Sequence, residues 1–316
     1  MIQPYPFMNE PNPLVSVIIP NYNHARFLKQ RIDSVVGQTY PNFEVILLDD
    51  CSTDNSRDII NGYAANPHVS HIVLNDQNSG STFVQWQKGF DLARGEYIWI
   101  AESDDVADCT FLEKMMGKMK ATPHAVLGFC GSTFIDQEGH TLPYSWDEPK
   151  RYENHGVYDG KLFAIHRLVY KNILYNASMM VFRKACLQGV DPIYRTFRYC
   201  GDWSFWFDIC LQGVVVQLKD KLNHFRQHTN KVSTRSRHNG DDFKEGARCQ
   251  LRIIEQLGLT PYQRRCIRGR VTKRIRKADI PNRAELIHDY PQLHAGTWRD
   301  ILVYEFDKYI GLSGLK

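Results

Sequence analysis

The predicted fold starts from one segment, Val15-Ser16-Val17-Ile18-Ile19-Pro20. It is a short run of mostly β-branched residues that ends at a proline, which is typical of a buried strand. Apolar residues at helical spacing follow over 26–38, and a second apolar run covers 43–48. The sequence over 15–48 therefore predicts a strand, a helix and a second strand, the repeating unit of a parallel sheet.

The same alternation continues to residue 129. Further strands are expected over 69–74, 97–101 and 125–129, with helices over 56–65, 82–94 and 110–120. After a loop-rich stretch, the pattern predicts a strand over 177–182, a helix over 202–211, short strands over 214–216 and 222–225, and helices from 243 onward. Such alternation implies right-handed crossovers. We therefore expect an α/β fold, a mostly parallel sheet flanked by helices, with a helical C-terminal extension.

Composition narrows the class of protein. The 316 residues are 43% hydrophobic and 23% charged, which is ordinary for a soluble globular protein. The formal net charge of +4 is too small to indicate a nucleic-acid partner. No two of the eight cysteines have C-x-x-C spacing, so we expect no zinc site and a reducing cytoplasm. Residues 1–13 lack a signal-peptide pattern, and no apolar run approaches the roughly 20 residues that span a bilayer.

Polar segments follow four of the predicted strands. They are Pro20–Asn23, Asp49-Asp50, Asn75–Gly80 and Glu102–Asp105. The carboxyl ends of parallel strands meet at one edge of a sheet, and ligands bind there. The sequence therefore predicts a ligand site that these loops share.

The segment Glu102-Ser103-Asp104-Asp105 is the most acidic of these loops. If the chain stays extended, Ser103 and Asp105 face one way and Glu102 and Asp104 the other. One carboxylate can then hold a divalent cation such as Mg²⁺ or Mn²⁺ while another accepts hydrogen bonds from hydroxyls. The alternative is that Asp104 and Asp105 only cap the next helix.

Asp49 and Asp50 end the second strand and begin the stretch Asp-Asp-Cys-Ser-Thr-Asp. A carboxylate at this position can accept hydrogen bonds from a nucleobase edge or a ribose. The alternative is a turn that is stabilised by hydrogen bonds from the aspartate side chains to nearby backbone groups.

Taken in order, these motifs resemble family 2 glycosyltransferases of the GT-A fold. The resemblance rests on Val15–Asn23, Asp49–Asp54, Asn78–Gly80, Ala93–Ile98 and Ser103–Asp105. It is dense over about the first 130 residues and sparser over 176–234. The ordered series is far more specific than any single motif.

The resemblance implies a nucleoside-diphosphate-sugar donor, usually with uridine. It places the nucleobase and ribose at Pro20–Tyr22 and Asp50, hydroxyl contacts at Asp104, and a divalent metal, Mn²⁺ or Mg²⁺, at Asp105. The full set of expected donor-binding residues is Pro20, Tyr22, Asn23, Asp50, Asn78, Lys88, Asp104 and Arg226. Lys88 is included because the chain lacks the Ala-Arg-Asn element that commonly supplies a diphosphate-binding arginine in the family.

Two later segments complete the expected site. Asp202 lies between Gly201 and Trp203, a setting similar to that of the family's catalytic base, and a carboxylate there can remove a hydroxyl proton. Trp203 and Trp206 would then contact the acceptor. The alternative is that Asp202 caps a helix whose tryptophans lie in the core. His228 resembles a metal ligand of the family, although a lone histidine often has no special role.

The segment 264–277 is strongly basic. Eight of its 14 residues are Lys or Arg, and Ile267, Val271 and Ile275 form a narrow apolar stripe at helical spacing. Two interpretations remain open: peripheral contact with an anionic membrane near a lipid-linked acceptor, or packing of the stripe on the catalytic domain. RNA binding is a weaker third alternative, and no nucleic-acid partner is expected because no RNA-binding module is present.

The motifs and the resemblance together predict an inverting glycosyltransferase of the cytoplasm or its membrane face, acting on a saccharide or lipid-linked acceptor in bacterial cell-surface polysaccharide synthesis. We expect a tail (1–13), a catalytic domain (14–234) and a basic helical region (235–316), with the donor half at 14–133 and the acceptor half at 134–234. A catalytically silent nucleotide-sugar-binding protein is one alternative. A sugar nucleotidyltransferase is another, but it should have a glycine-rich, basic loop where Pro20–His24 stands.

Overall fold

The computed structural model describes residues 12–144, 156–228, 241–277, 280 and 283–311. The chain forms two compact units. One, here called the sheet unit, comprises Met1–Asp159, Asn176–Val190 and Gln212–His228. The other, the helical unit, comprises Gly160–Tyr175, Asp191–Leu211 and Thr229–Lys316.

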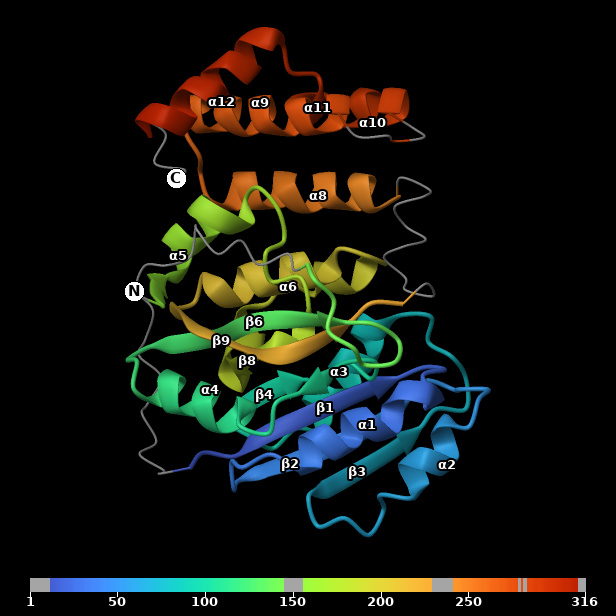
Figure 1. Cartoon of the computed structure of the whole chain (residues 1–316). Coiled ribbons are helices and arrows are strands. Elements are labelled where there is room, and N and C mark those ends of the chain that lie inside the picture. The colour runs from blue at the N-terminus through green and yellow to red at the C-terminus, as the bar shows by residue number, and fades with distance from the viewer. Residues whose placement is uncertain (1–11, 145–155, 229–240, 278–279, 281–282, 312–316) are drawn as a thin grey trace. The chain divides into compact units, whose positions relative to one another are not determined.

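The first half of the sheet unit is parallel, as predicted (Figure 1). Strand β1 (Val15–Asn21) pairs with β2 (Phe43–Asp49) and β4 (Tyr97–Ile100), and β2 pairs with β3 (Val69–Leu74). The connecting helices are α1 (Ala25–Val36), α2 (Ser56–Asn61) and α3 (Thr82–Leu92), and α4 (Phe111–Lys120) follows β4. Every residue of β1, β2 and β4 is buried because helices cover both faces of a parallel sheet.

The second half of the sheet is mixed. Strand β8 (Met180–Arg183) runs antiparallel to both β4 and β6 (Ala125–Ile135). Strand β9 (Val214–Arg226) is parallel to β6, and β5 (Val106–Ala107) and β7 (Val157–Asp159) pair antiparallel with β9. The strand order is β3-β2-β1-β4-β8-β6-β9-β5, with β7 beside β9.

The predictions between residues 134 and 225 differ in detail from the structure. The two short strands predicted over 214–216 and 222–225 are one strand, β9, because its polar middle is exposed and does not need apolar residues. The loop-rich stretch from 134 contains the end of β6 and, further on, β7. The remaining short helical turns are η1 (Ala164–Leu168), η2 (Ala177–Met179), η3 (Lys184–Gly189) and η4 (Pro192–Thr196).

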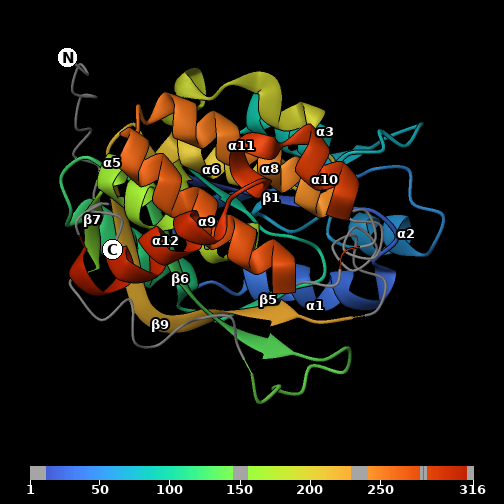
Figure 2. The same cartoon turned by 90° about the horizontal axis from the view of Figure 1, so that it is seen from above.

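The helical unit contains seven named α-helices in its described residues, most of which appear in Figure 2. They are α5 (Gly160–Phe163), α6 (Gly201–Cys210), α8 (Asp241–Gln256), α9 (Pro261–Lys277), α10 (Arg283–Asp289), α11 (Pro291–His294) and α12 (Trp298–Ile310). This division differs from the continuous domains predicted, since α5 and α6 group with the C-terminal helices. Helix α6 is apolar on nearly all sides, as expected of a helix surrounded by other elements.

The basic helix α9 packs its apolar stripe inside the helical unit. Ile267, Val271 and Ile275 are 0%, 6% and 2% exposed. A Cβ on Gly269 would lie 2.1 Å from the carbonyl oxygen of Asp300, so the glycine allows α12 to approach α9 closely. The stripe is therefore core, as the packing interpretation predicted, and these three side chains are not accessible to a membrane. None of the helices in the described part of the chain is both long and apolar enough to cross a bilayer.

Candidate functional site

The loop after β1 connects the loops after β2 and β4. Asn23 has a φ of 56°, a left-handed conformation that asparagine tolerates better than most residues. Its backbone N–H donates to Ser52 Oγ at 2.9 Å, and its side-chain oxygen accepts from the Thr53 N–H at 2.8 Å. The next residue, His24, places Nδ1 2.8 Å from Ser103 Oγ. The carboxyl ends of three parallel strands are thus joined by hydrogen bonds, as the sequence predicted.

Asp50 organises the loop that follows β3. Its buried carboxylate accepts from Asn75 Nδ2 at 2.7 Å, from Gln85 Nε2 at 2.8 Å and from Asn78 Nδ2 at 3.1 Å. It also accepts from the Ser79 N–H and hydroxyl, at 2.9 Å and 2.8 Å. Asp50 and Asn78 are therefore in contact, and their hydrogen bonds stabilise the loop that follows β3.

The other expected donor-binding residues of this region differ in exposure. Pro20 is buried within β1, whereas Tyr22 is 47% exposed and presents an aromatic ring beside the loops. Lys88 is exposed on α3, and its ammonium donates to the side-chain oxygen of Asn75, which in turn donates to Asp50. Tyr22 and Lys88 are accessible to a ligand, whereas Pro20 lies inside the strand that precedes Tyr22.

The acidic loop alternates in burial as the sequence predicted, although it forms a turn and not a strand. Ser103 and Asp105 are buried, at 2% and 0% exposure, while Glu102 and Asp104 are partly exposed. The Asp105 carboxylate accepts from Asn176 Nδ2 and Ser178 Oγ, both at 2.7 Å, and from the Arg226 N–H at 3.0 Å. Its surroundings differ from those expected of a metal ligand, because both of its oxygens accept hydrogen bonds inside the sheet unit.

Arg226 also has a different role from the one expected. The residue is 1% exposed, and its guanidinium donates to the carbonyl oxygens of Asp104, Asp136 and Gln137 and to the side chain of Gln30. A buried arginine that is bound to backbone carbonyls is unavailable to a diphosphate. It fixes the backbone of the acidic loop instead.

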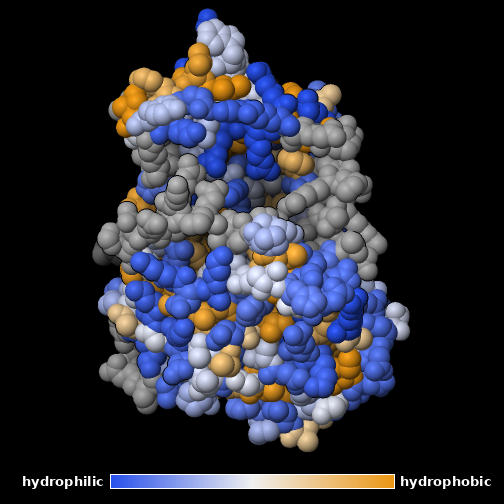
Figure 3. All heavy atoms as spheres, viewed as in Figure 1, coloured by the Kyte–Doolittle hydropathy of each residue, from blue (hydrophilic) through white to orange (hydrophobic). Residues whose placement is uncertain are grey.

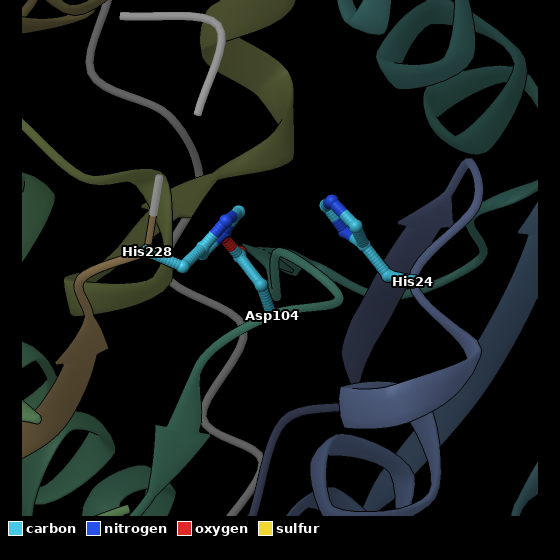
Figure 4. A group of neighbouring side chains, drawn as sticks. All are labelled: His24, Asp104 and His228. Atoms are coloured by element: carbon cyan, nitrogen blue, oxygen red, sulfur yellow. The ribbon is translucent and has the colours of Figure 1, made fainter. Parts of the chain in front are cut away.

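His24, Asp104 and His228 come together from three segments, as Figure 4 shows. His24 follows β1, Asp104 follows β4, and His228 follows β9. His228 Nε2 lies 3.0 Å from Asp104 Oδ2, and each side chain offers one ligand atom within 4.8 Å of the other two. Two imidazole nitrogens and one carboxylate oxygen are ligands for divalent transition metals, Mn²⁺ among them, whereas Mg²⁺ prefers oxygen ligands. Sequence reasoning missed His24, although it directly follows Pro20–Asn23 at the same edge.

Two further charged groups lie beside this cluster. The half-buried Glu102 accepts from Trp86 Nε1 at 3.1 Å, and burial, followed by the negative charge of Asp104, raises its pKa to about 8. Arg31 of α1 is fully buried, with its guanidinium carbon 5.1 Å from the centre of the Trp99 ring. Burial lowers the pKa of Arg31 to about 10, against the opposing charges of Asp105 and Asp104. Arg31 therefore offsets part of the negative charge of the acidic loop.

Asp202 lies in the first turn of α6, in the helical unit. Its carboxylate accepts from Asn172 Nδ2 and from the Trp203 N–H, both at 2.8 Å. Burial raises the pKa of Asp202 to about 7, and the charge of Glu245 acts in the same direction. A carboxylate with a pKa near neutral is suited to accept a proton from a hydroxyl group, because it combines the ionised form with useful basicity.

The two tryptophans beside Asp202 are core residues. Trp203 is 6% exposed and its indole N–H donates to the Leu168 carbonyl at 3.0 Å. Trp206 is fully buried, with its ring centre 4.8 Å from that of Phe205 in an edge-on contact. Stacking on a sugar requires an exposed ring face, so the structure corresponds to the core alternative and not to the expected acceptor contacts.

The chain matches the model of glycosyl transferase family 2 over residues 16–184, more than half of its length, and it belongs to that family. The matched region contains Asp50, Asp104 and Asp105, and ends shortly after β8. The match therefore includes the loops after β1, β2, β3 and β4.

Sequence relatives agree with this assignment, and a solved structure shares the fold. The chain is 29% identical over 228 residues to TuaG of Bacillus subtilis (strain 168), named for teichuronic acid biosynthesis, covering 70% of this chain and 82% of TuaG. It is 29% identical to the glycosyltransferase RP339 of Rickettsia prowazekii (strain Madrid E), over 62% of this chain and 58% of RP339. The fold matches S. aureus TarS 1–349 in complex with UDP-GlcNAc, with a TM-score of 0.66 at 18% identity, over 92% of this chain and 83% of TarS.

Proposed function

We propose that the protein is an inverting glycosyltransferase that moves a sugar from a UDP-sugar to an acceptor hydroxyl. The observation that carries the proposal is the joining of three strand-end loops around His24, Asp104 and His228. The name of TuaG and the UDP-GlcNAc complex of TarS support a uridine donor and a saccharide or lipid-linked acceptor of the bacterial cell surface.

Donor binding belongs to the sheet unit in this proposal. Tyr22, Asn23 and the Asp50–Asn78 loop receive the nucleoside, and Lys88 supplies positive charge to the diphosphate. The metal-binding role passes from Asp105 to Asp104, with His24 and His228 as the other ligands. A divalent cation bound by these three side chains, Mn²⁺ in preference to Mg²⁺, would supply positive charge. This charge would offset the negative charge of the departing diphosphate.

Proton removal belongs to Asp202. Its ionised carboxylate takes the proton of the acceptor hydroxyl while the hydroxyl oxygen forms a bond to the anomeric carbon of the donor sugar. The bond between that carbon and the diphosphate oxygen breaks, and UDP leaves with the bonding electron pair. Because attack and departure occur on opposite faces of one carbon, the anomeric configuration inverts.

The substitution Asp202→Asn tests this assignment. Asparagine keeps the size of the side chain but cannot accept the proton, so transfer should fall by about 10²–10⁴-fold. UDP affinity, measured by calorimetry, should stay unchanged because donor binding uses other residues. Asp289→Asn, which alters an exposed carboxylate of the helical unit, is the matched control. Transfer by Asp202→Asn at the wild-type rate would remove Asp202 from the mechanism.

Two measurements on the wild-type chain test the reaction class. UDP release from a panel of UDP-sugars, with and without acceptor saccharides, separates transfer from binding alone. A chain that binds UDP-sugars but never releases UDP is the silent alternative. NMR of the first-formed product gives the anomeric configuration, and retention of the donor's configuration would contradict the single-displacement mechanism.

A further inference from the structure

Helix α12 carries its large apolar side chains on its exposed face. Trp298, Leu302, Phe306, Tyr309 and Ile310 are 61%, 55%, 58%, 81% and 49% exposed. At about 100° per residue they cover roughly 120° of the helix circumference. Figure 3 shows hydrophobic residues gathered over this helix. Apolar side chains of a surface helix normally face the core, so this orientation is inverted.

The acidic residues of α12 contact the basic helix α9, and two of them, Asp300 and Asp307, are buried. Asp300 is 2% exposed and pairs with Arg265 and Arg268, at 2.8 Å and 3.0 Å. Glu305 pairs with Lys273, and Asp307 is 4% exposed. Ionic contacts with α9 thus hold α12 in place. The apolar face is left outward by this arrangement and contributes little to the core.

The fully exposed charges of α12 are positive, and Glu305 at the edge of the apolar face is paired with Lys273. All residues of α12 are described, and its exposed charged residues are Arg299 and Lys308, both cations. The adjoining α9 contains eight Lys and Arg residues and no acid. Arg299 also lies over the Trp298 ring, at 5.5 Å from its centre. An occupant of this face must therefore be apolar within and anionic at its border.

We propose that α12 docks on the surface of an anionic membrane. Helices with an apolar face rich in Trp, Phe and Leu and bordered by cations lie in the interface between headgroups and acyl chains. Tryptophan and tyrosine favour this region because their rings are amphipathic. A second copy of the chain is a poorer occupant, because pairing two such faces brings the cations of both copies together. RNA is also a poorer occupant, because its bases and phosphates would not bury the aliphatic side chains of Leu302 and Ile310.

This inference is independent of the transfer chemistry, and vesicle binding by the full-length protein tests it. The wild type should sediment with vesicles that contain phosphatidylglycerol and much less with vesicles of phosphatidylcholine alone. High salt should weaken binding because it screens the lysine and arginine charges. The double variant Leu302→Ser/Phe306→Ser should bind at least about tenfold more weakly, since two apolar side chains no longer enter the interface.

A control and a second measurement keep the outcome unambiguous. Tyr144→Ser/Leu162→Ser removes two apolar side chains of similar exposure, 54% and 53%, that do not belong to α12, and should bind as the wild type does. Arg299→Gln/Lys308→Gln should lose the preference for phosphatidylglycerol. Equal binding by the α12 variant and the control overturns the proposal. A dimer, seen by light scattering, that Leu302→Ser/Phe306→Ser abolishes would assign the face to a second copy instead.

Discussion

Asp104 and Asp105 are neighbours in sequence, but their carboxylates have different surroundings. Asp104 is partly exposed beside His228, whereas Asp105 is fully buried and hydrogen-bonded to Asn176 and Ser178. We expect Asp104→Asn to lower Mn²⁺ affinity by at least about tenfold, because one anionic ligand is lost. Asp105→Asn should instead lower the free energy of unfolding by about 1–3 kcal/mol, because buried donors lose their acceptor. Calorimetry with Mn²⁺ and denaturant unfolding measure the two effects.

The pair of variants provides its own control. Each substitution removes one carboxylate charge from the same loop, so a general loss of negative charge would affect both Mn²⁺ affinities equally. His24→Gln should weaken Mn²⁺ binding as Asp104→Asn does. If Asp105→Asn abolished Mn²⁺ binding in a folded protein while Asp104→Asn did not, the original assignment of the metal to Asp105 would be restored.

The raised pKa of Asp202 predicts the pH dependence of transfer. Burial raises this pKa to about 7, and the base acts only when it is ionised. The rate under saturating substrates should therefore rise about tenfold per pH unit below 7 and level off above it. The free energy of unfolding should change with pH in the opposite direction to the rate. A folded-state pKa above the unfolded value stabilises the fold at low pH, and this contribution is lost as pH rises through 7.

Two variants distinguish the contribution of Asp202 to the pH profile from that of Glu102, whose carboxyl pKa is also raised. The residual activity of Asp202→Asn should lack the rise toward pH 7, whereas Glu102→Gln should keep it. Asp202→Asn should also unfold at a higher temperature than the wild type above pH 7, because it no longer places a charge in a buried position. A rise in rate that persists in Asp202→Asn would assign the titration to another group.

The burial of the acidic loop could be predicted because it follows from the spacing of its residues. The period-2 alternation over Glu102–Asp105 separated partly exposed from buried side chains, although it could not say which of the two sides receives the metal. The partners of Asp105, Asn176 and Ser178, lie more than 70 residues away along the chain. No local pattern reports such contacts. For the same reason Arg226 was expected to bind the donor, whereas its guanidinium donates to backbone carbonyls that are distant in sequence.

At the scale of elements, hydrophobic patterns predicted well whether a segment is a helix or a strand. They predicted poorly which face of a helix is turned toward the core. The parallel strands β1, β2 and β4 were evident because burial on both faces requires continuous apolar runs. Helix α9 was expected from its periodicity, and its narrow stripe turned out to be core. In α12 the apolar residues face outward, since ion pairs between Asp300 and the arginines of α9 decide which side faces inward. Periodicity identifies a face of a helix, but its neighbours decide where that face points.

At the scale of the whole molecule, the chain crosses between its two units several times. The sheet unit takes up the chain again at Asn176 and at Gln212, and the helical unit includes α6 between them. Sequence patterns favour continuous domains because they detect local periodicity, whereas compact units form from contacts between distant segments. The division assigns the metal ligands His24, Asp104 and His228 to one unit and Asp202 to the other.

This division predicts which segments donor binding protects from amide hydrogen exchange. UDP with Mn²⁺ should slow amide hydrogen exchange in the sheet-unit loops at 21–24, 50–52, 75–80 and 102–104, because a ligand stabilises the segments that it contacts. Helices α9 and α12 of the same full-length chain should exchange as before. Asp104→Asn serves as the control and should reduce the Mn²⁺-dependent part of the protection. Equal protection in α9 and α12 would show that the helical unit shares in donor binding, which the ligand set of the sheet unit does not predict.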